Sequence, residues 1–496
     1  MKILFKYTTI IALLLLSGCE ESLEEININP NQSVENPSLD LLFGAIVPGM
    51  IGQLVQSYEV PGQLAQQIAV KNSEVGTLTH DEDAISRRFW ETVYSENNGA
   101  LRNAGFLIFE AEERGNQVYQ ALGKILKAYI LSYTTDLFGD IPYTDAAQGF
   151  RFGEQYIFPK YDAQSEVYRA MLSDLREANT LLETAAANQR IDESRDLLFK
   201  GDKGVWRKFA NSLRLRLLMR ISEVQDVQAE IATLFENPGM FPIFESIEET
   251  PQFVFEDITR WPFQPERVNS SDIRLSSIVV DIMKGEGNEN QISTRSDPRL
   301  SFIVDPTETS VANGTPEFIG QPVGIASDIE EDANRSLLSS AFRTLNTFWL
   351  MTYAELLFIK SEAIHKGFIT GNAQEVYRNG VLASITKYGI DETTAESIAY
   401  LEEVGNNFVG NEIKHLAIQR WLDQVNNGFE GYSVWRRMNH PILTPGQDAV
   451  APQIPLRYFY SSKTTDKNQV NADEAINRPP LNGRNTTFQK VWWDRD

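Results

Sequence analysis

The feature that most constrains the fold of this chain is the recurrence of apolar residues at spacings of three and four. Between residues 116 and 137, Leu122, Ile125, Leu126 and Tyr129 follow this spacing. On an α-helix they form one wide apolar stripe that must be buried. Similar patterns cover 84–113, 162–185, 201–222, 346–367, 371–388, 391–403 and 411–427. The sequence therefore predicts a mainly α-helical fold.

Residues 353–389 suggest how the helices are paired. The segment YAELLFIKSEAIHKG is followed by AQEVYRNGVLASITKYG, which is similar to the helix–turn–helix unit of tetratricopeptide repeats. Asp162 is a candidate cap for the helix at 162–185, since an aspartate often accepts the first free backbone N–H groups. Glu355 lies in a segment that is apolar nearly all round, and we expect it to be a paired core acid.

Between residues 238 and 345 the helical period is weak, and Pro, Gly, Asn, Ser and Asp are frequent. We expect irregular chain here, with a helix at 274–284 and a strand at QFVFED. Long irregular segments of a compact domain often carry function. This segment is therefore the candidate ligand-side insertion of a single domain over 38–496.

The first 18 residues have the composition of a secretory signal peptide. Lys2 and Lys6 precede the apolar run 10–16, which is far shorter than the roughly 20 residues of a membrane span. Cys19, the only cysteine, follows Gly18 directly. The arrangement resembles the lipobox of bacterial lipoproteins, in which this thiol is lipidated and becomes the new N-terminus. The alternative is an ordinary signal peptide with an incidental cysteine.

The residues after Cys19 are predicted to form a lipidated acidic tether over 19–37. Glu20, Glu21, Glu24 and Glu25 form an acidic patch that resembles the surface-export signal of lipoproteins in Bacteroidota. A simple solvated tether is the alternative, and both readings are compatible. The resemblance implies a lipid-anchored protein of the outer membrane that faces the exterior.

The charge of the chain excludes one class of partner. Removal of residues 1–18 takes away two lysines and no acid, so the net charge changes from −23 to −25. Nucleic-acid binding draws most of its affinity from Lys and Arg, and we therefore expect no nucleic-acid partner. The basic residues of 201–222 could instead meet anionic lipid, but we expect them to pair with acids on neighbouring helices.

Motifs for catalysis and for cofactors are missing from the sequence. It contains no G-x-S-x-G, H-E-x-x-H, G-x-x-x-x-G-K-[ST] or G-x-G-x-x-G pattern. The four histidines are far apart, so no metal site is predicted, and the acidic stretches 80–83 and 327–332 lack the alternating pattern of a calcium loop. A pair of carboxylates for glycoside hydrolysis stays possible, because 68 acids make some close pair inevitable.

Two loops offer the groups that bind sugars, which present CH faces to aromatic rings and hydroxyls to polar side chains. The first is ITRWPFQPERVNSSDIR (258–274), in which prolines flank the aromatic residues and lower the cost of ordering them. The second is KNSEVGTLTHDED (71–83), between two predicted helices. The candidate ligand residues are Arg260, Trp261, Phe263, Arg267, Asn269, Asp272 and Arg274 in the first loop, and Asn72 and His80 in the second. The alternative for Trp261 is a ring that fills the core beneath its loop.

Several stretches together resemble one family, the SusD/RagB outer-membrane lipoproteins, and its SusD-like branch in particular. Their order and spacing are more specific than any one of them. The stretches are ININPNQ (26–32), YTTDLFGDIPYTDA (133–146), WRKFANSLRLRLLMRIS (206–222), DPRL (297–300), MTYAELLFIKSEA (351–363), IQRWLDQVNNGFEGYSVWRRMNHPIL (418–443) and IPLRYFYSSKTTDKNQVN (454–471).

The resemblance implies tetratricopeptide-like helix pairs with loop-rich insertions and a few short strands. It also implies a protein without catalysis or cofactor that binds oligosaccharides, or peptides, and delivers them to a SusC-like TonB-dependent transporter. Two other hypotheses stay open, a lipid-anchored glycoside hydrolase and a helical-repeat scaffold that binds no nutrient.

Overall fold

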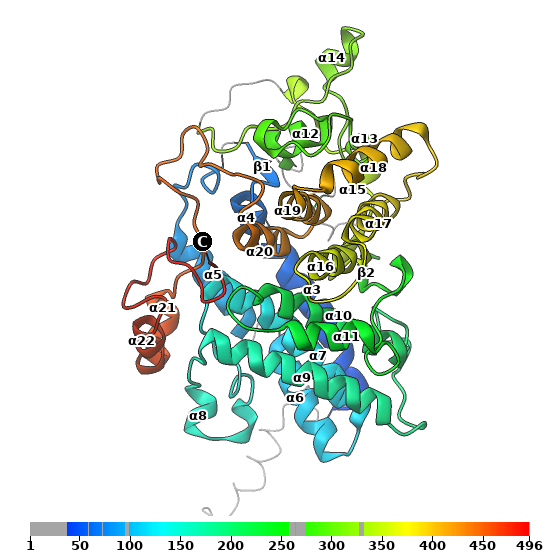
Figure 1. Cartoon of the computed structure of the whole chain (residues 1–496). Coiled ribbons are helices and arrows are strands. Elements are labelled where there is room, and N and C mark those ends of the chain that lie inside the picture. Colours follow the sequence, from blue (N-terminus) through cyan, green and yellow to red (C-terminus); the bar gives the residue numbers. More distant parts are fainter. Residues whose placement is uncertain are drawn as a thin grey trace, which may run out of the picture.

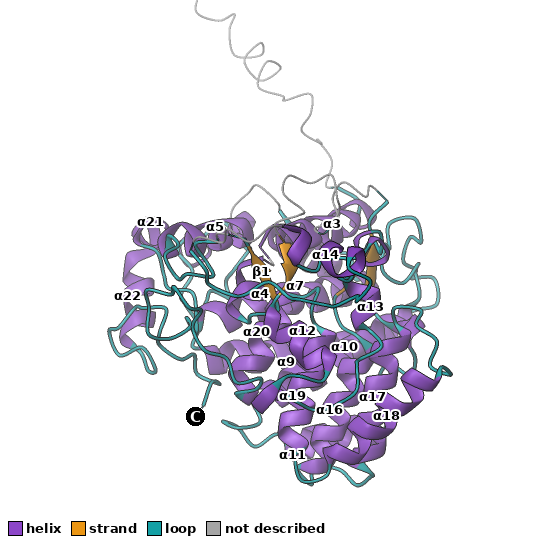
Figure 2. Cartoon of the chain, turned by 90° about the horizontal axis from the view of Figure 1, so that it is seen from above, coloured by secondary structure: helices purple, strands orange, loops and turns teal. Residues whose placement is uncertain are grey.

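The computed structural model describes residues 37–57, 59–71, 73–94, 99–256, 263, 273–326 and 332–495. Helices make up most of this part, and its strands are short (Figure 2). Among the described residues, no helix is both long enough and apolar enough to cross a membrane.

The long helices of the first half of the chain form a layer in the lower part of Figure 1. Helix α6 packs on α7, α7 packs on α9, and α9 packs on α10, while α3 covers α6. The elements are α3 (Leu39–Ser57), α4 (Glu59–Leu64), β1 (Ile68–Val70), α5 (Glu82–Tyr94), α6 (Ala100–Glu113), α7 (Gln117–Phe138), α8 (Glu154–Ile157), α9 (Gln164–Thr184), α10 (Lys203–Arg220) and α11 (Gln228–Glu236).

The second half begins with short elements and then returns to longer helices. Helix α16 packs on α17, α17 on α18, and α19 on α20, and α10 joins this group to the first layer through α16. The elements are β2 (Gln252–Val254), β3 (Ile273–Leu275), α12 (Ser277–Lys284), α13 (Leu300–Ile303), α14 (Glu308–Ala312), α15 (Ser340–Arg343), β4 (Thr347–Trp349), α16 (Tyr353–His365), α17 (Ala373–Thr386), α18 (Ala395–Phe408), α19 (Glu412–Asp423), α20 (Gly428–Met438), α21 (Ser462–Thr465) and α22 (Gln469–Asn477).

Small residues let the paired helices approach closely, as the repeat-like sequence predicts. A Cβ atom added to Gly380 of α17 would lie 2.7 Å from the ring of Phe358 on α16. No larger residue fits at this contact without displacing the ring. The mainly helical, repeat-like fold expected from the sequence is confirmed.

Three local predictions were wrong. The segment 84–113 forms two helices, α5 and α6, instead of one. The segment 346–367 begins with strand β4, which pairs with β2, before helix α16 starts at Tyr353. Asp162 does not cap α9, because its carboxylate accepts the backbone N–H groups of Tyr143 and Thr144.

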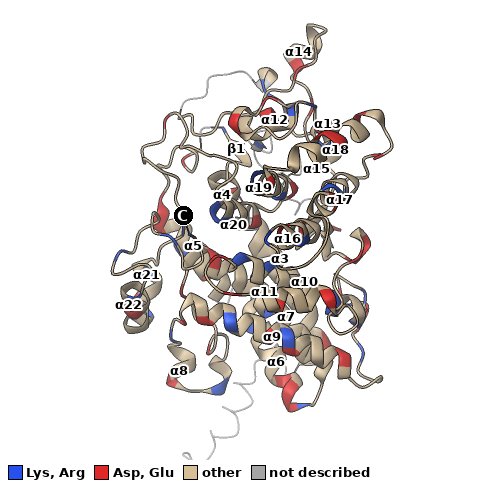
Figure 3. Cartoon of the chain, in the orientation of Figure 1, with Lys and Arg blue, Asp and Glu red and all other residues tan. Residues whose placement is uncertain are grey.

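Opposite charges are buried at the centre of the molecule, where α10, α16, α19 and α20 meet. Arg216 donates two hydrogen bonds of 2.6 Å to the carboxylate of Glu355, and Arg220 Nη2 lies 2.6 Å from Glu430 Oε2. Figure 3 shows the basic residues of these helices next to acidic ones. The predicted pairing of the α10 cations with acids on other helices is confirmed, and so is the role of Glu355 as a paired core acid.

Candidate ligand-binding face

The structure joins the two predicted ligand loops at one small sheet. Strands β1 and β3 are antiparallel, and Val70 lies opposite Ile273. The loop 71–83 leaves the sheet directly after Val70, and the segment 258–272 enters it directly before Ile273. Both predicted loops therefore attach to the body at the same edge, although about 190 residues separate them along the chain.

Two further segments pack against the loop 71–83. The Asp448 backbone N–H donates to the Gly324 carbonyl at 2.9 Å, and the Val450 N–H donates to the Thr77 carbonyl at 3.1 Å. Gly324 has a φ of +67°, and a Cβ atom there would lie 2.4 Å from the Gly76 carbonyl oxygen. We call segments 71–83, 273–276, 320–326 and 444–450 the loop face; it lies beside β1 in the upper part of Figure 1.

Most of the predicted ligand residues cannot be placed on this face. Arg260, Trp261, Arg267, Asn269, Asp272 and Asn72 lie outside the described residues, and so does the predicted lipidation site Cys19. Their roles stay predictions.

Phe263 and Arg274 are described and are buried. Phe263 is 2% exposed, and its ring centroid lies 5.1 Å from that of Phe342. Arg274 is 1% exposed, and its guanidinium donates to Gln321 Oε1 at 3.3 Å. These contacts position the strand and its flank. Neither side chain offers surface to a ligand in this state, and their role as ligand contacts stays a prediction.

His80 is half-buried on the loop face. Burial lowers the pKa of its imidazole, although the acids Glu82, Glu74 and Asp81 act in the opposite direction. Its Nδ1 is buried and has no hydrogen-bond partner among the described residues.

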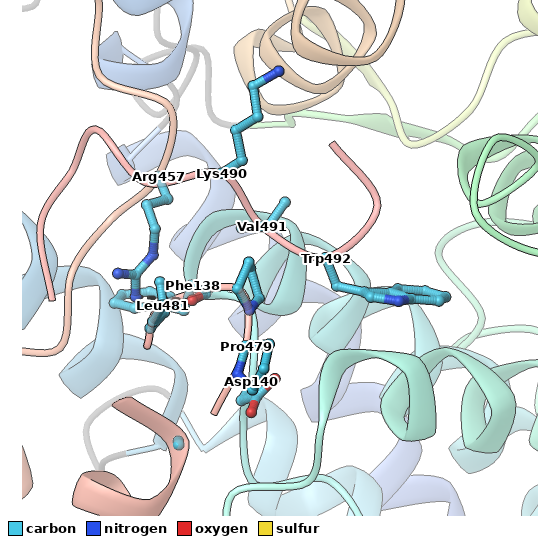
Figure 4. A pocket seen from close by; sticks show the side chains of 11 residues that line it. Phe138, Asp140, Arg457, Pro479, Leu481, Lys490, Val491 and Trp492 are labelled. Carbon is cyan, nitrogen blue, oxygen red and sulfur yellow. Dashed lines mark hydrogen bonds between the residues drawn. The ribbon is translucent and has the colours of Figure 1, made fainter. Parts of the chain in front are cut away.

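The hollows of the described surface differ greatly in size. One of about 10 Å³ lies beside the loop face, next to Gln66 and Gly446. Another of about 10 Å³ lies among Phe138, Arg457, Pro479 and Trp492 (Figure 4). Each holds about one water molecule, which is too little for a sugar ring. Two larger hollows of about 510 and 550 Å³ lie along α17, α18 and α19. No motif in the sequence indicates them, because their linings come from separate helices.

Two neighbouring core carboxylates, those of Glu355 and Glu430, are unsuited to glycoside hydrolysis. Glu355 and Glu430 both contact Arg216, at 2.6 and 3.8 Å, and neither side chain is exposed. Burial raises the pKa of Glu355, whereas Arg220, Arg216 and Arg420 outweigh burial at Glu430 and hold its pKa below the usual range. A polysaccharide cannot reach this pair without unfolding of the core. The described residues also hold no group of three or more His, Cys, Asp or Glu side chains placed to bind a metal ion.

Comparisons with known proteins agree with this architecture. A chitin-binding protein of known structure is 25% identical, with a TM-score of 0.78, and the alignment covers 93% of this chain and 100% of that one. A SusD homologue from Bacteroides fragilis is 24% identical with a TM-score of 0.72, over 93% and 100% of the two chains. A SusD homologue from Bacteroides uniformis is 19% identical with a TM-score of 0.75, also over 93% and 100%. The last two show the shared fold alone.

No curated protein sequence matches the chain. A family model does match residues 30–461, which is most of the chain, and its description is starch-binding and associating with the outer membrane. The chain therefore belongs to the SusD-like family of outer-membrane-associated nutrient-binding proteins.

Proposed function

We propose that this protein is a cell-surface lipoprotein that binds oligosaccharides, or peptides, and delivers them to a SusC-like TonB-dependent transporter of the outer membrane. The family match over residues 30–461 is the observation that carries the proposal. The joining of the two predicted ligand loops at one edge of the β1–β3 sheet supports it. The chitin-binding neighbour adds support for a glycan as the cargo.

The proposal assigns binding without catalysis. We expect the purified lipoprotein to bind at least one member of a polysaccharide panel saturably and to release no products. Maltoheptaose and chitohexaose belong in that panel, because of the family description and the chitin-binding neighbour. Turnover of a bound glycan would support the hydrolase hypothesis instead. If neither glycans nor peptides bind, the scaffold hypothesis remains.

Trp261 is the residue to test first in the ligand loop. Replacement by alanine should weaken glycan binding by about 1–3 kcal/mol if the ring is a central contact, and should leave the Tm nearly unchanged. Isothermal titration and a thermal melt measure the two effects. Phe263→Ala is the comparison: its ring is buried, so we expect a lower Tm, with a cost of about 3–5 kcal/mol. A Trp261→Ala variant with normal affinity and a low Tm would show that Trp261 is a core residue.

A surface for the transporter is suggested by exposed apolar residues around α8. Phe152, Ile157 and Phe158 are 90%, 61% and 45% exposed. Phe152 has a φ of +48°, a conformation that bulky residues rarely adopt, so its exposed ring is held in a strained backbone. Contiguous exposed apolar side chains often mark an interaction surface.

This apolar surface lies on the side of the molecule where the predicted tether ends. Phe150 packs on Phe109 of α6 at 5.0 Å between ring centroids, and Arg114, at the end of α6, donates to the Pro37 carbonyl at 3.4 Å. Phe109 and Arg114 are about 8 Å apart along the helix axis. The surface is therefore close to residue 37 and suits a partner embedded in the membrane.

The variant Phe152→Ser/Ile157→Ser/Phe158→Ser should reduce co-purification of the transporter in mild detergent and leave glycan binding unchanged. The matched control replaces three exposed apolar residues elsewhere, Met240, Val254 and Val311, by serine. Equal transporter recovery from both variants would contradict this surface. Loss of binding to lipid vesicles, with transporter recovery intact, would assign it to the bilayer.

A further inference from the structure

The two large hollows lie side by side along helix α18. The first, of about 510 Å³, lies between α17 and α18. The second, of about 550 Å³, lies between the α18–α19 turn and segment 288–294. Asn406 of α18 lines both of them. Each volume falls in the range of known small-molecule sites.

Side-chain amides are the most frequent lining groups, and three of them are held by the protein itself. Gln374 Nε2 donates to the Gly405 carbonyl at 2.9 Å, Asn407 Nδ2 to the Ile292 carbonyl at 3.2 Å, and Asn411 Nδ2 to the Asn407 carbonyl at 3.3 Å. Each bond uses an N–H group and leaves the amide oxygen as an acceptor. The ordering cost of these side chains is therefore partly met before a ligand arrives.

The charges of the two linings are balanced. Glu375 and Glu402 face the first hollow together with Arg378, and Lys414 lines the second. His415 also lines the second hollow, where burial and the neighbouring Lys414 lower the pKa of its imidazole to about 4. Its Nδ1 lies 3.1 Å from the Tyr377 hydroxyl, so the ring is oriented. The hollows thus present many hydrogen-bonding groups and no excess of either charge.

We propose that the two hollows along α18 form a second binding site for a neutral, polyhydroxylated ligand, namely a stretch of oligosaccharide. The fixed amide oxygens accept hydrogen bonds from sugar hydroxyls, and Val409, which is 63% exposed at the rim, offers an apolar contact to a CH face. The class of ligand rests on the proposed function, while the site is separate from the loop face.

One contact joins a residue next to the second hollow to a residue near the loop face. The Asn290 side chain exchanges two hydrogen bonds with the backbone of Ile442, at 3.0 and 2.6 Å. Ile442 lies two residues before the loop-face segment 444–450, and Asn290 precedes the lining residue Gln291.

The test uses Asn406→Trp, because an indole at this exposed position obstructs the part of each hollow that residue 406 lines. The full-length lipoprotein in detergent is titrated with maltoheptaose and with chitohexaose, and hydrogen exchange is measured with and without the glycan. We expect the wild type to show protection at 288–294, 372–382 and 401–415 in addition to the loop face. Asn406→Trp should remove that protection. It should also raise the Kd of the second binding event at least fivefold.

Ile398→Trp is the matched control, since it puts the same ring at an exposed position of α18 that lines neither hollow. It should bind as the wild type does, and both variants should keep the wild-type Tm. Glycan binding by Asn406→Trp with unchanged affinity, stoichiometry and protection would overturn the second site and leave the proposed function intact. Failure of the wild type to bind any glycan would contradict the proposed glycan function itself.

Discussion

Several charged side chains of the core pair with opposite charges from distant parts of the chain. Arg216 and Glu355 are 139 residues apart, and Arg220 and Glu430 are 210 apart. The sequence predicts that the cations of α10 are paired, because so acidic a chain supplies many partners. It does not predict which acids they contact, since that depends on how α10, α16 and α20 cross.

His415 is a residue whose burial gives a measurable pH dependence. Its folded-state pKa is about 4, below the value of 6.5 for an unperturbed histidine. The unfolded chain therefore binds a proton first as the pH falls, so the folded state loses stability between pH 6.5 and 4. At pH 5 this loss amounts to about 2 kcal/mol relative to pH 8.

We expect His415→Gln to lack this component, because glutamine does not titrate and can still meet the Tyr377 hydroxyl. Urea unfolding of both proteins at pH 8 and pH 5 measures the difference, in which the effects of the carboxylates cancel. An equal loss of stability in the two proteins would show that His415 is not the titrating group.

At the scale of helices and strands, some helix N-termini are capped by the residue that precedes the helix, and others by a residue from a distant part of the chain. Asn116, Asp202, Thr352 and Asn372 each cap the helix that follows them, and the sequence suffices for such caps. Helix α9 differs, because its N-cap residue Ala163 has no capping side chain. The N–H of Gln164 instead donates to Asp140 Oδ1 at 2.8 Å. A cap from 24 residues upstream leaves no local signal, which is why the prediction of Asp162 failed.

The prediction at this scale is that Asp140→Ala destabilises the protein by about 1–2 kcal/mol, through loss of the cap. The carboxylate also pairs with Arg478, so Asp140→Asn, which keeps an acceptor but no charge, should cost less. Denaturant unfolding and protection of the first turn of α9 from hydrogen exchange give the two readouts. No loss of protection in Asp140→Ala would mean that water caps the helix equally well.

The same limit applies to the candidate binding residues. The composition of 71–83 and 258–274 predicts ligand loops, and the pairing of β1 with β3 places their attachment points together. Alternation of apolar and polar residues cannot show that Phe263 and Arg274 point inward, because their burial depends on Phe342 and Gln321 from later segments. The hollows along α18 have a weak signal in sequence, the density of Asn and Gln at 372–379 and 406–411.

For the molecule as a whole, anchoring is separate from folding. Residues 1–36 lie outside the described part, and the hydrophobic core begins with Leu39. Two or more acyl chains on Cys19 would hold this body at a bilayer, at about 0.8 kcal/mol for each buried CH₂ group. The fold needs neither the anchor nor a disulfide, since Cys19 is the only cysteine.

We therefore expect Cys19→Ala to abolish labelling by a fatty-acid probe while the released protein keeps the wild-type Tm. Replacement of Glu20, Glu21, Glu24 and Glu25 by alanine should leave the labelling intact and remove access to protease added outside the cell. Normal labelling of Cys19→Ala would contradict lipidation at this residue. Unchanged protease access in the second variant would contradict the export signal.

Four buried ion pairs, Arg216–Glu355, Arg220–Glu430, Arg420–Glu362 and Arg437–Glu362, join helices α10, α16, α19 and α20 to one another. Mutations in 71–83, 320–326 or 444–450 replace no member of these four pairs. During evolution, proteins with this architecture can therefore change their surface segments, and with them the ligand that they bind. The sequences of their helices can vary as long as the buried ion pairs are kept.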